Sequence, residues 1–120
     1  MNVVVYGAGG HGRVVADVAA SAGASVVAFV DDGPGMTGEV CGVPVMAWDD
    51  QLVDAAGRGS IALALGIGDG RARAAILDKA SAAGFTVATL VHPSAVVARS
   101  ASLGAGTVVM AAAVVNPGAR

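Results

Sequence analysis

The chain has 120 residues and a formal net charge of −2, and 55% of its residues are hydrophobic. The sequence contains no basic run, so we expect no nucleic-acid partner. A single cysteine, Cys41, excludes an internal disulfide framework and a cysteine-based zinc site. No signal-peptide pattern opens the chain, and the longest apolar run, residues 108–115, is too short to span a membrane. We therefore expect a reduced, cytoplasmic protein.

The first ninety residues alternate predicted strands with predicted helices. Runs of β-branched residues that end at glycine or at acids predict strands within 2–7, 25–32, 60–66 and 85–91. Apolar residues at helical spacing predict helices over about 11–22 and 69–83, and a short helix that Asp49 or Asp50 caps. A turn is predicted at 33–35. This alternation predicts an α/β fold with an open parallel sheet.

From residue 91 the pattern changes to a period of six: VHPSAV, VARSAS, LGAGTV, VMAAAV, VNPGAR. Each hexad opens on an aliphatic residue, and a small residue follows four places later. This period fits neither a helix nor a strand and is typical of a β-solenoid, in which each hexad forms one flat side. The alternative is a helix through "VVMAAAVVN", but the glycines and proline around it disfavour one.

The number of hexads raises a question about the end of the chain. A left-handed solenoid of this kind uses three hexads for each coil, so five hexads make less than two coils. The last coil of such a solenoid would have no capping segment and would leave an apolar edge of unpaired backbone open. We therefore expect the sequence to be cut off inside a longer protein.

The stretch GAGGHG at residues 7–12 follows a predicted strand and opens a predicted helix, as a G-x-G-x-x-G loop must do to bind a phosphate. We expect Gly7 to permit a tight turn, Gly9 to let a ligand approach the backbone and Gly12 to allow close packing. Asp31 and Asp32 follow the next strand, where a carboxylate can bind ribose hydroxyls. The alternative is a tight turn without a ligand, beside two solvated acids.

A second glycine-rich loop, residues 66–70, follows a later strand and predicts a second wall of the same cleft. Within it, Asp69 is predicted to cap a helix. His11 is interpreted as a ligand contact, with a solvated residue as the alternative, and His92 as a structural hydrogen bond at a corner. We interpret Cys41 as a small packing residue and Trp48 as a packing anchor.

Several blocks occur in a familiar order: "YGAGGHG", "DD", "GVPV", "GIGDGRAR", "LVHPSA" and then the hexads. Together they resemble the sugar O- and N-acyltransferases of the sialic acid O-acetyltransferase type, with the UDP-4-amino-sugar N-acetyltransferases of the NeuD/PglD kind. The resemblance covers the whole chain. It implies a small Rossmann-like domain over 1–90 that binds a nucleotide sugar, usually a UDP-sugar. It also implies the first coils of a left-handed β-helix over 91–120. In the parent family this β-helix forms a homotrimer and binds acetyl-CoA between subunits, and most of that acetyl-CoA site is expected to be absent from this chain. We expect no metal.

The same resemblance assigns roles to individual residues. It places Gly9, Gly10, His11 and Gly12 along the diphosphate. It places Asp31 and Asp32 at the uridine or ribose end. The opposing loop is formed by Gly68, Asp69 and Gly70. Gly70 stands where the family usually has Asn, so one polar contact is expected to be missing. The family's catalytic histidine lies further along than this chain reaches. We therefore predict no catalytic residue here, and binding without catalysis.

A second interpretation stays open. The glycine loop and the acid pair also suit an NAD-type or regulatory dinucleotide-binding module, in which the hexads serve as a short oligomerisation segment. The hexads favour the nucleotide-sugar interpretation, because nicotinamide dehydrogenases do not usually continue into a six-residue repeat. A third interpretation, a purely structural trimerising cap, leaves the glycine loop unexplained.

Overall fold

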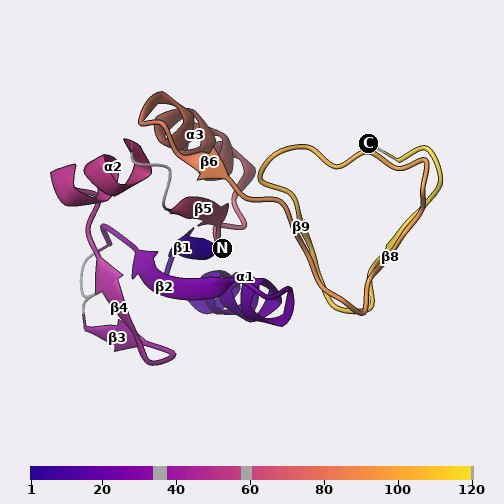
Figure 1. Ribbon diagram of the computed structural model, residues 1–120, viewed down its shortest axis with the longest axis horizontal. Coiled ribbons are helices and arrows are strands. Elements are labelled where there is room, and N and C mark those ends of the chain that lie inside the picture. The colour runs from indigo at the N-terminus through magenta and orange to yellow at the C-terminus, as the bar shows by residue number, and fades with distance from the viewer. Residues whose placement is uncertain (34–37, 58–60, 120) are drawn as a thin grey trace.

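The computed structural model of the protein describes residues 1–33, 38–57 and 61–119 (Figure 1). Its first part contains a six-stranded sheet and three helices. The strands are β1 (Asn2–Tyr6), β2 (Ser25–Val30), β3 (Glu39–Val40), β4 (Val43–Met46), β5 (Ala62–Leu65) and β6 (Thr86–Val87). The helices are α1 (Gly10–Ser21), α2 (Asp50–Gly57) and α3 (Gly70–Ala82). Among the described residues, no helix combines the length and the apolar character needed to cross a bilayer.

The sheet has the strand order β3-β4-β2-β1-β5-β6. All neighbouring pairs run parallel except β3 and β4, which form an antiparallel hairpin at one edge. The predicted α/β class is confirmed, but the prediction of a purely parallel sheet is wrong at this edge. The chain passes from β1 outward through β2 to β4, and then returns to the other side of β1 at β5. In such sheets, ligands bind at the carboxyl ends of the strands where the order reverses, which here lies between β1 and β5.

Most elements lie within one or two residues of their predicted positions. Helix α2 is capped by Asp49, whose Oδ1 accepts from the N–H of Leu52 at 3.0 Å. The predicted strand 85–91 is wrong in one respect, because the structure divides it into β6 and β7 (Leu90–Val91). The N–H of Ala88 still donates to β5, whereas that of Leu90 donates to Thr107 in the hexads. Most of the turn predicted at 33–35 lies outside the described residues.

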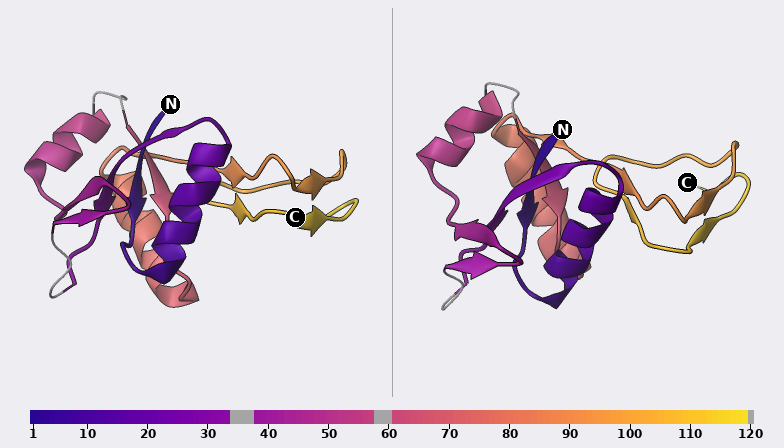
Figure 2. Two further views of the ribbon diagram at one scale, coloured as in Figure 1. Left: turned by 90° about the horizontal axis from the view of Figure 1, so that it is seen from below. Right: turned by 60° about the horizontal axis from the view of Figure 1, so that its bottom comes forward.

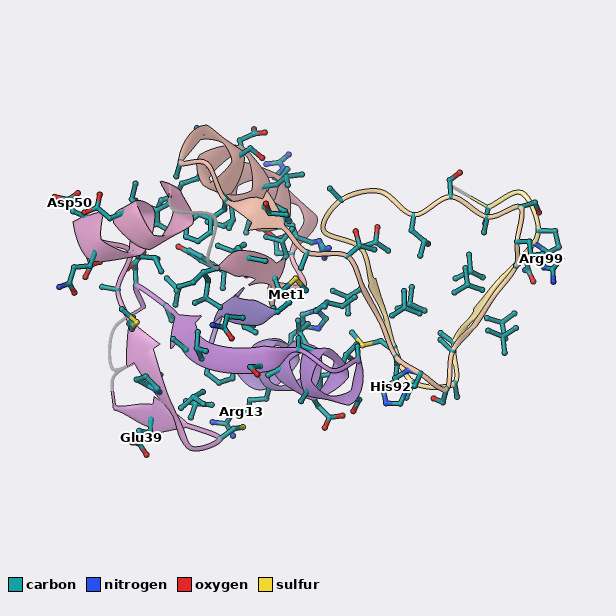
Figure 3. The ribbon with its side chains drawn as sticks, viewed as in Figure 1. Met1, Arg13, Glu39, Asp50, His92 and Arg99 are labelled. Atoms are coloured by element: carbon teal, nitrogen blue, oxygen red, sulfur yellow. The ribbon has the colours of Figure 1, made fainter. Side chains whose placement is uncertain are left out.

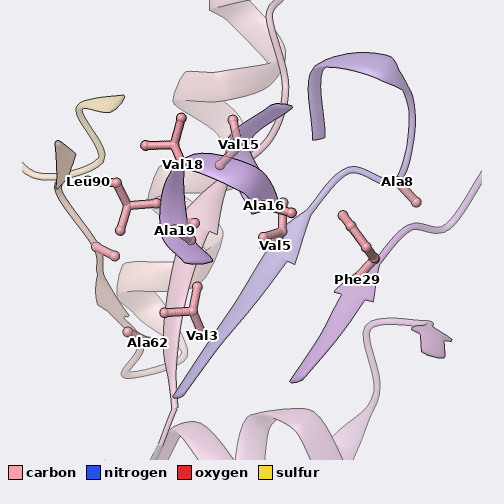
Figure 4. Packing of buried hydrophobic residues seen from close by; sticks show 12 residues of the cluster. Val3, Val5, Ala8, Val15, Ala16, Val18, Ala19, Phe29, Ala62 and Leu90 are labelled. Atoms are coloured by element: carbon pink, nitrogen blue, oxygen red, sulfur yellow. The ribbon is translucent and has the colours of Figure 1, made fainter. Parts of the chain in front are cut away.

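Helices cover both faces of the sheet, so its core has two layers. On one face α1 packs on the central strands, with small side chains such as Val15 and Ala19 against Val3 and Val5 (Figure 4). On the other face α2 and α3 enclose larger side chains, among them Leu63, Leu65 and Phe85. Burying one valine, leucine or phenylalanine completely stabilises a fold by about 1.5–3 kcal/mol. These two layers therefore hold the strand ends, and the loops that follow them, in fixed positions.

The hexad region winds through four two-residue strands: β7, β8 (Val96–Val97), β9 (Val108–Val109) and β10 (Val114–Val115). Strand β7 pairs in parallel with β9, and β8 with β10, so each strand meets the chain three hexads later. The path has a three-sided outline in Figure 1 and projects away from the sheet in Figure 2. We call residues 90–119 the winding. Val109, which opens a hexad, is buried, whereas Val96 and Val114 are 62% and 65% exposed.

Serine side chains join successive turns of the winding at its corners. The Oγ of Ser94 accepts from the N–H of Ala112 at 2.9 Å, and the Oγ of Ser100 accepts from the N–H of Gly118 at 2.8 Å. At the first corner His92 Nδ1 accepts from the N–H of Ser94 at 3.0 Å. Figure 3 shows His92 at this corner. The predicted structural hydrogen bond of His92 is confirmed.

Candidate functional site

The two glycine-rich loops meet at the carboxyl edge of the sheet. Residues 7–12 follow β1 and residues 66–70 follow β5, and these two strands are parallel neighbours. A hydrogen bond from the N–H of Gly66 to the carbonyl of Tyr6, at 2.8 Å, joins the loops where they leave the sheet. The structure therefore brings together the two loops that the sequence predicts to form one cleft.

Three glycines lock the bases of these loops together. Gly7 has a φ of +107°, a conformation that favours glycine. A Cβ on Gly12 would lie 1.8 Å from the carbonyl oxygen of Gly7, and a Cβ on Gly66 would lie 2.8 Å from the Cα of Gly12. These contacts are too close for any side chain, so the predicted turn at Gly7 and close packing at Gly12 are confirmed. The role of Gly66 was missed, because only the adjacency of β1 and β5 reveals it.

The tip of the first loop is open. Gly9 and Gly10 are exposed, and a Cβ on either would have no other atom within 4 Å. Gly9 is the N-cap of α1 and offers no side-chain cap, and the first turn of α1 contains no acid. The first N–H groups of a helix carry a partial positive charge and have no intrahelical acceptor. This end of α1 is therefore suited to an anion, and exposed His11 lies in the same turn.

The tip of the second loop is built differently. Gly68 and Gly70 are also exposed and unobstructed. Asp69, however, is the N-cap of α3, and its Oδ2 accepts from the N–H of Ala72 at 3.0 Å. The predicted cap at Asp69 is confirmed. Because its carboxylate already occupies the helix end, α3 is less available to an anion than α1.

The carboxylate of Asp31 supports the first loop from within the protein. Its Oδ2 accepts from the N–H of Ala8 at 3.0 Å, and its Oδ1 accepts from the N–H of Gly33 at 2.8 Å. Asp31 is half-buried, and its own N–H donates to Met46. Asp31 therefore fixes the glycine loop against the end of β2. The sequence signal for this role is an acid placed immediately after the strand that neighbours β1.

Asp32 is exposed and belongs to a different set of contacts. Its Oδ2 accepts from the hydroxyl of Tyr6 at 3.2 Å, and its Oδ1 accepts from the N–H of Trp48 at 3.1 Å. Burial raises the pKa of Tyr6, and the negative charge of Asp32, the hydrogen bond to it and the charge of Asp31 raise it further. Tyr6 thus remains a hydrogen-bond donor to Asp32 at neutral pH and well above it.

Trp48 is fixed by its neighbours. Its ring lies 5.4 Å from that of Phe85 and 6.2 Å from that of Tyr6, between centroids. The Nζ of Lys79 lies 4.4 Å from the Trp48 centroid, within cation–π range. The interpretation of Trp48 as a packing anchor agrees with these contacts. Lys79 was missed, because only the fold brings α3 against the end of β4.

A hollow elsewhere in the described part of the chain is lined by no residue of either glycine loop. Its volume is about 330 Å³, and it separates α1 from β2 and from the β3–β4 hairpin. Cys41 lines it, is exposed, and has a φ of +51° in the hairpin turn. Interpreting Cys41 as a packing residue was therefore wrong. In the described ranges, no group of three or more His, Cys, Asp or Glu side chains is placed to hold a metal ion.

Comparison with known proteins adds to this geometry. Residues 2–80 match the PglD N-terminal domain. The chain is also similar to solved structures, including a variant of perosamine N-acetyltransferase from Caulobacter crescentus in complex with CoA and GDP-perosamine. That similarity has 38% identity and a TM-score of 0.85, and it covers 98% of this chain and 55% of the other.

A second similar structure is the acetyltransferase domain of PglB from Neisseria gonorrhoeae FA1090, in complex with acetyl coenzyme A. Here the identity is 38% and the TM-score 0.80, over 94% of this chain and 54% of the other. The chain therefore spans about half the length of the solved structures that it matches.

Proposed function

Because this chain belongs to the PglD N-terminal domain family, within the NeuD/PglD-like sugar acyltransferases, we propose that it binds a nucleotide sugar for an acetyl-CoA-dependent sugar N- or O-acetyltransferase. The family predicted by resemblance is confirmed. The observation that carries the proposal is the first glycine loop. There the N-terminus of α1 has no side-chain cap, and its N-cap Gly9 and first residue Gly10 are both unobstructed, at the point where the strand order reverses.

The chemistry of a diphosphate suits this loop. The exposed backbone of Gly9 and Gly10 lets phosphate oxygens approach the first N–H groups of α1, whose dipole favours negative charge. His11 donates a further hydrogen bond from the same turn. Gly12 contributes by its missing side chain, because it allows the loop to close on Gly7. Gly68, Asp69 and Gly70 form the opposing wall.

At the nucleoside end, Asp32 is the better candidate for a ligand contact. Both oxygens of Asp31 already accept backbone N–H groups, whereas Asp32 is exposed. An ionised carboxylate has about four lone-pair sites. Asp32 can therefore accept a hydrogen bond from the ribose or the base while it keeps its hydrogen bonds from the Tyr6 hydroxyl and the Trp48 N–H. The predicted ligand is a UDP-sugar. The perosamine N-acetyltransferase similar to this chain was solved with GDP-perosamine, so the nucleobase is the part of the proposal that most needs a test.

For the winding, we propose that residues 91–120 begin a left-handed β-helix, separate from a domain over 1–90. In the whole protein it would trimerise and hold acetyl-CoA. Support comes from the parallel pairing across three hexads and from the similar structures solved with CoA or acetyl coenzyme A. The histidines of this sequence are His11 and His92, and His92 Nδ1 is engaged at a corner. We therefore expect acetyl transfer by this chain alone to stay at background.

Isothermal titration calorimetry tests the ligand class. UDP and a UDP-sugar should bind to the chain, GDP should bind more weakly, and NADH should not bind. Tighter binding of GDP would replace the uridine nucleotide by a guanosine nucleotide and keep the sugar-nucleotide class. Tighter binding of NADH would overturn the proposal in favour of the dinucleotide module.

A pair of histidine variants tests the loop. His11→Ala should weaken UDP-sugar binding about tenfold, as expected for the loss of one hydrogen bond to a charged group. His92→Ala is the matched control, because His92 belongs to a corner of the winding. The affinity of this control for the UDP-sugar should equal that of the unchanged protein. Equal UDP-sugar affinities in the unchanged protein and in both variants would show that His11 is a solvated residue.

A further inference from the structure

One turn of the winding is seated in the α/β domain. Gly106 is buried, has a φ of +80°, and has so little space that a Cβ would lie 2.9 Å from Leu65 Cδ1 and 3.3 Å from Val87 Cγ1. The neighbouring Gly104 carbonyl accepts from the hydroxyl of Thr89 at 3.0 Å. Leu65 is the last residue of β5 and precedes the second glycine loop. The turn 104–106 therefore lies against the strand end that carries one wall of the candidate site.

Arg73 makes the contact between this turn and α3. Its guanidinium donates a hydrogen bond to the carbonyl of Gly106, and the side chain is half-buried. Arginine suits this position because its guanidinium remains charged and offers several donors from a long stem. Arg71, two residues earlier on the same helix, is exposed and provides a natural comparison.

The same residue reaches the candidate site through its backbone. The N–H of Arg73 donates to the carbonyl of Asp69 at 2.8 Å, within the first turn of α3. A single residue thus contacts the second glycine loop with its backbone and the winding with its side chain. The two contacts are therefore separated by only one turn of α3.

We propose that Arg73 is a positioning residue that couples the nucleotide-sugar loop to the winding. This inference rests on the proposed function of the site. A ligand that orders residues 68–70 also orders the first turn of α3, and through Arg73 it holds the turn 104–106 in place. In the whole enzyme, this coupling fixes the sugar held by the domain relative to the groups that the winding carries.

Amide hydrogen exchange followed by NMR on the full chain measures the coupling. The N–H groups of Leu90 and His92 donate to Thr107 and Val109 at 2.9 Å each, so their exchange reports pairing between successive turns of the winding. Saturating UDP should slow exchange of both amides at least about fivefold, the lower end of common coupling strengths.

Three variants separate coupling from simple support. Arg73→Ala should remove the effect of UDP on these amides, so that the ratio of rates with and without UDP falls to about one. Arg73→Lys should restore part of that ratio, because lysine keeps a charged donor. Arg71→Ala should behave like the unchanged protein. A merely structural role for Arg73 would raise both rates and leave their ratio unchanged.

The failure of the inference differs from the failure of the proposed function. Unchanged UDP-dependent slowing in Arg73→Ala would overturn the inference, as would binding of UDP by calorimetry without any slowing in the unchanged protein. If GDP binds and UDP does not, the same exchange experiment is made with GDP. If neither nucleotide binds, the proposed function fails, and the ligand-free exchange rates still test whether Arg73 holds the turn 104–106 to α3. Faster exchange of the Leu90 and His92 amides in Arg73→Ala than in Arg71→Ala would then support the role of Arg73 in holding the turn 104–106. Equal exchange rates in the two variants would overturn that role.

Discussion

The two glycine-rich loops share a sheet edge and a composition, yet they end in different helix caps. The loop after β1 leads into α1 through Gly9, which offers only backbone. The loop after β5 leads into α3 through Asp69, whose carboxylate satisfies the helix end. Each loop also has glycines packed against backbone, Gly7 and Gly12 in the first and Gly66 in the second, and two glycines that are unobstructed.

This difference shows that glycines in one motif serve separate purposes. A packed glycine is required by the fold, because a methyl group would overlap neighbouring backbone. An open glycine before an uncapped helix leaves room for a ligand and contributes little to stability. A glycine-rich loop therefore leaves an anion site in one case and precedes a helix start that its own side chain caps in the other.

The largest effect is expected at Gly12. Gly12→Ala would place a methyl carbon 1.8 Å from the carbonyl oxygen of Gly7, which cannot move without opening the loop. We expect a loss of about 4 kcal/mol or more in the free energy of unfolding, close to complete unfolding. Urea denaturation followed by the fluorescence of Trp48, the only tryptophan in the sequence, measures it. Gly10→Ala is the control and should lose less than about 1 kcal/mol.

A smaller effect is expected where Asp31 supports the first loop. Asp31→Ala leaves the N–H groups of Ala8 and Gly33 without their acceptor, and Ala8 is buried. The free energy of unfolding should fall by about 1–3 kcal/mol, and UDP affinity should fall with it. Asp32→Ala should weaken UDP binding with a smaller loss of stability, because Asp32 is exposed. Equal stability losses in the two variants would contradict this division of roles.

Removing the cap of the second loop should cost less again. Asp69→Ala deletes the acceptor of the Ala72 N–H, and such changes typically destabilise by about 1 kcal/mol. The variant also converts the α3 terminus into an uncapped one, like that of α1. Thermal unfolding gives the stability, and calorimetry with inorganic phosphate shows whether a new weak anion site appears. A loss well above 2 kcal/mol would mean that Asp69 does more than cap the helix.

The smallest effect concerns pH. The raised pKa of Tyr6 means that the folded protein holds the phenol proton more tightly than the unfolded chain does. The resulting contribution to the free energy of unfolding is fully present below the pKa of the unfolded chain, about 10. It is lost as the pH rises through the higher pKa of the folded protein. Tyr6 is the only tyrosine, so phenolate absorbance follows it alone. Tyr6→Phe should remove the part of the stability loss above pH 10 that is due to Tyr6. Asp32→Asn should lower the pKa of Tyr6, because it removes the negative charge of Asp32.

The residue types and their spacing within the glycine loops were enough to predict the close backbone contacts of the first loop and the helix cap of the second. The spacing in GAGGHG predicted the turn at Gly7 and the close approach at Gly12, and Asp69 was identified as a helix cap. Contacts set by strand order could not be predicted. Gly66 meets Gly12 because β5 lies beside β1, and Asp31 reaches Ala8 because β2 lies on the other side.

The break between β6 and β7 was missed for a related reason. Residues 85–91 read as one continuous strand, since no glycine or proline interrupts them. Only the competing partners, Leu63 for Ala88 and Thr107 for Leu90, show where the chain leaves the sheet. The ligand roles of the glycines, of His11 and of Asp32 stay predictions, because they concern a molecule that the fold alone does not reveal.

An NMR titration of the full, nitrogen-15-labelled chain with UDP tests the central claim most directly. The claim is that the uncapped start of α1, and not the capped start of α3, receives the phosphates. The account predicts the largest amide shifts at Gly9, Gly10 and His11, with smaller ones at Gly68 and Asp69. Shifts that are largest at the start of α3, or that avoid both loops, would contradict it.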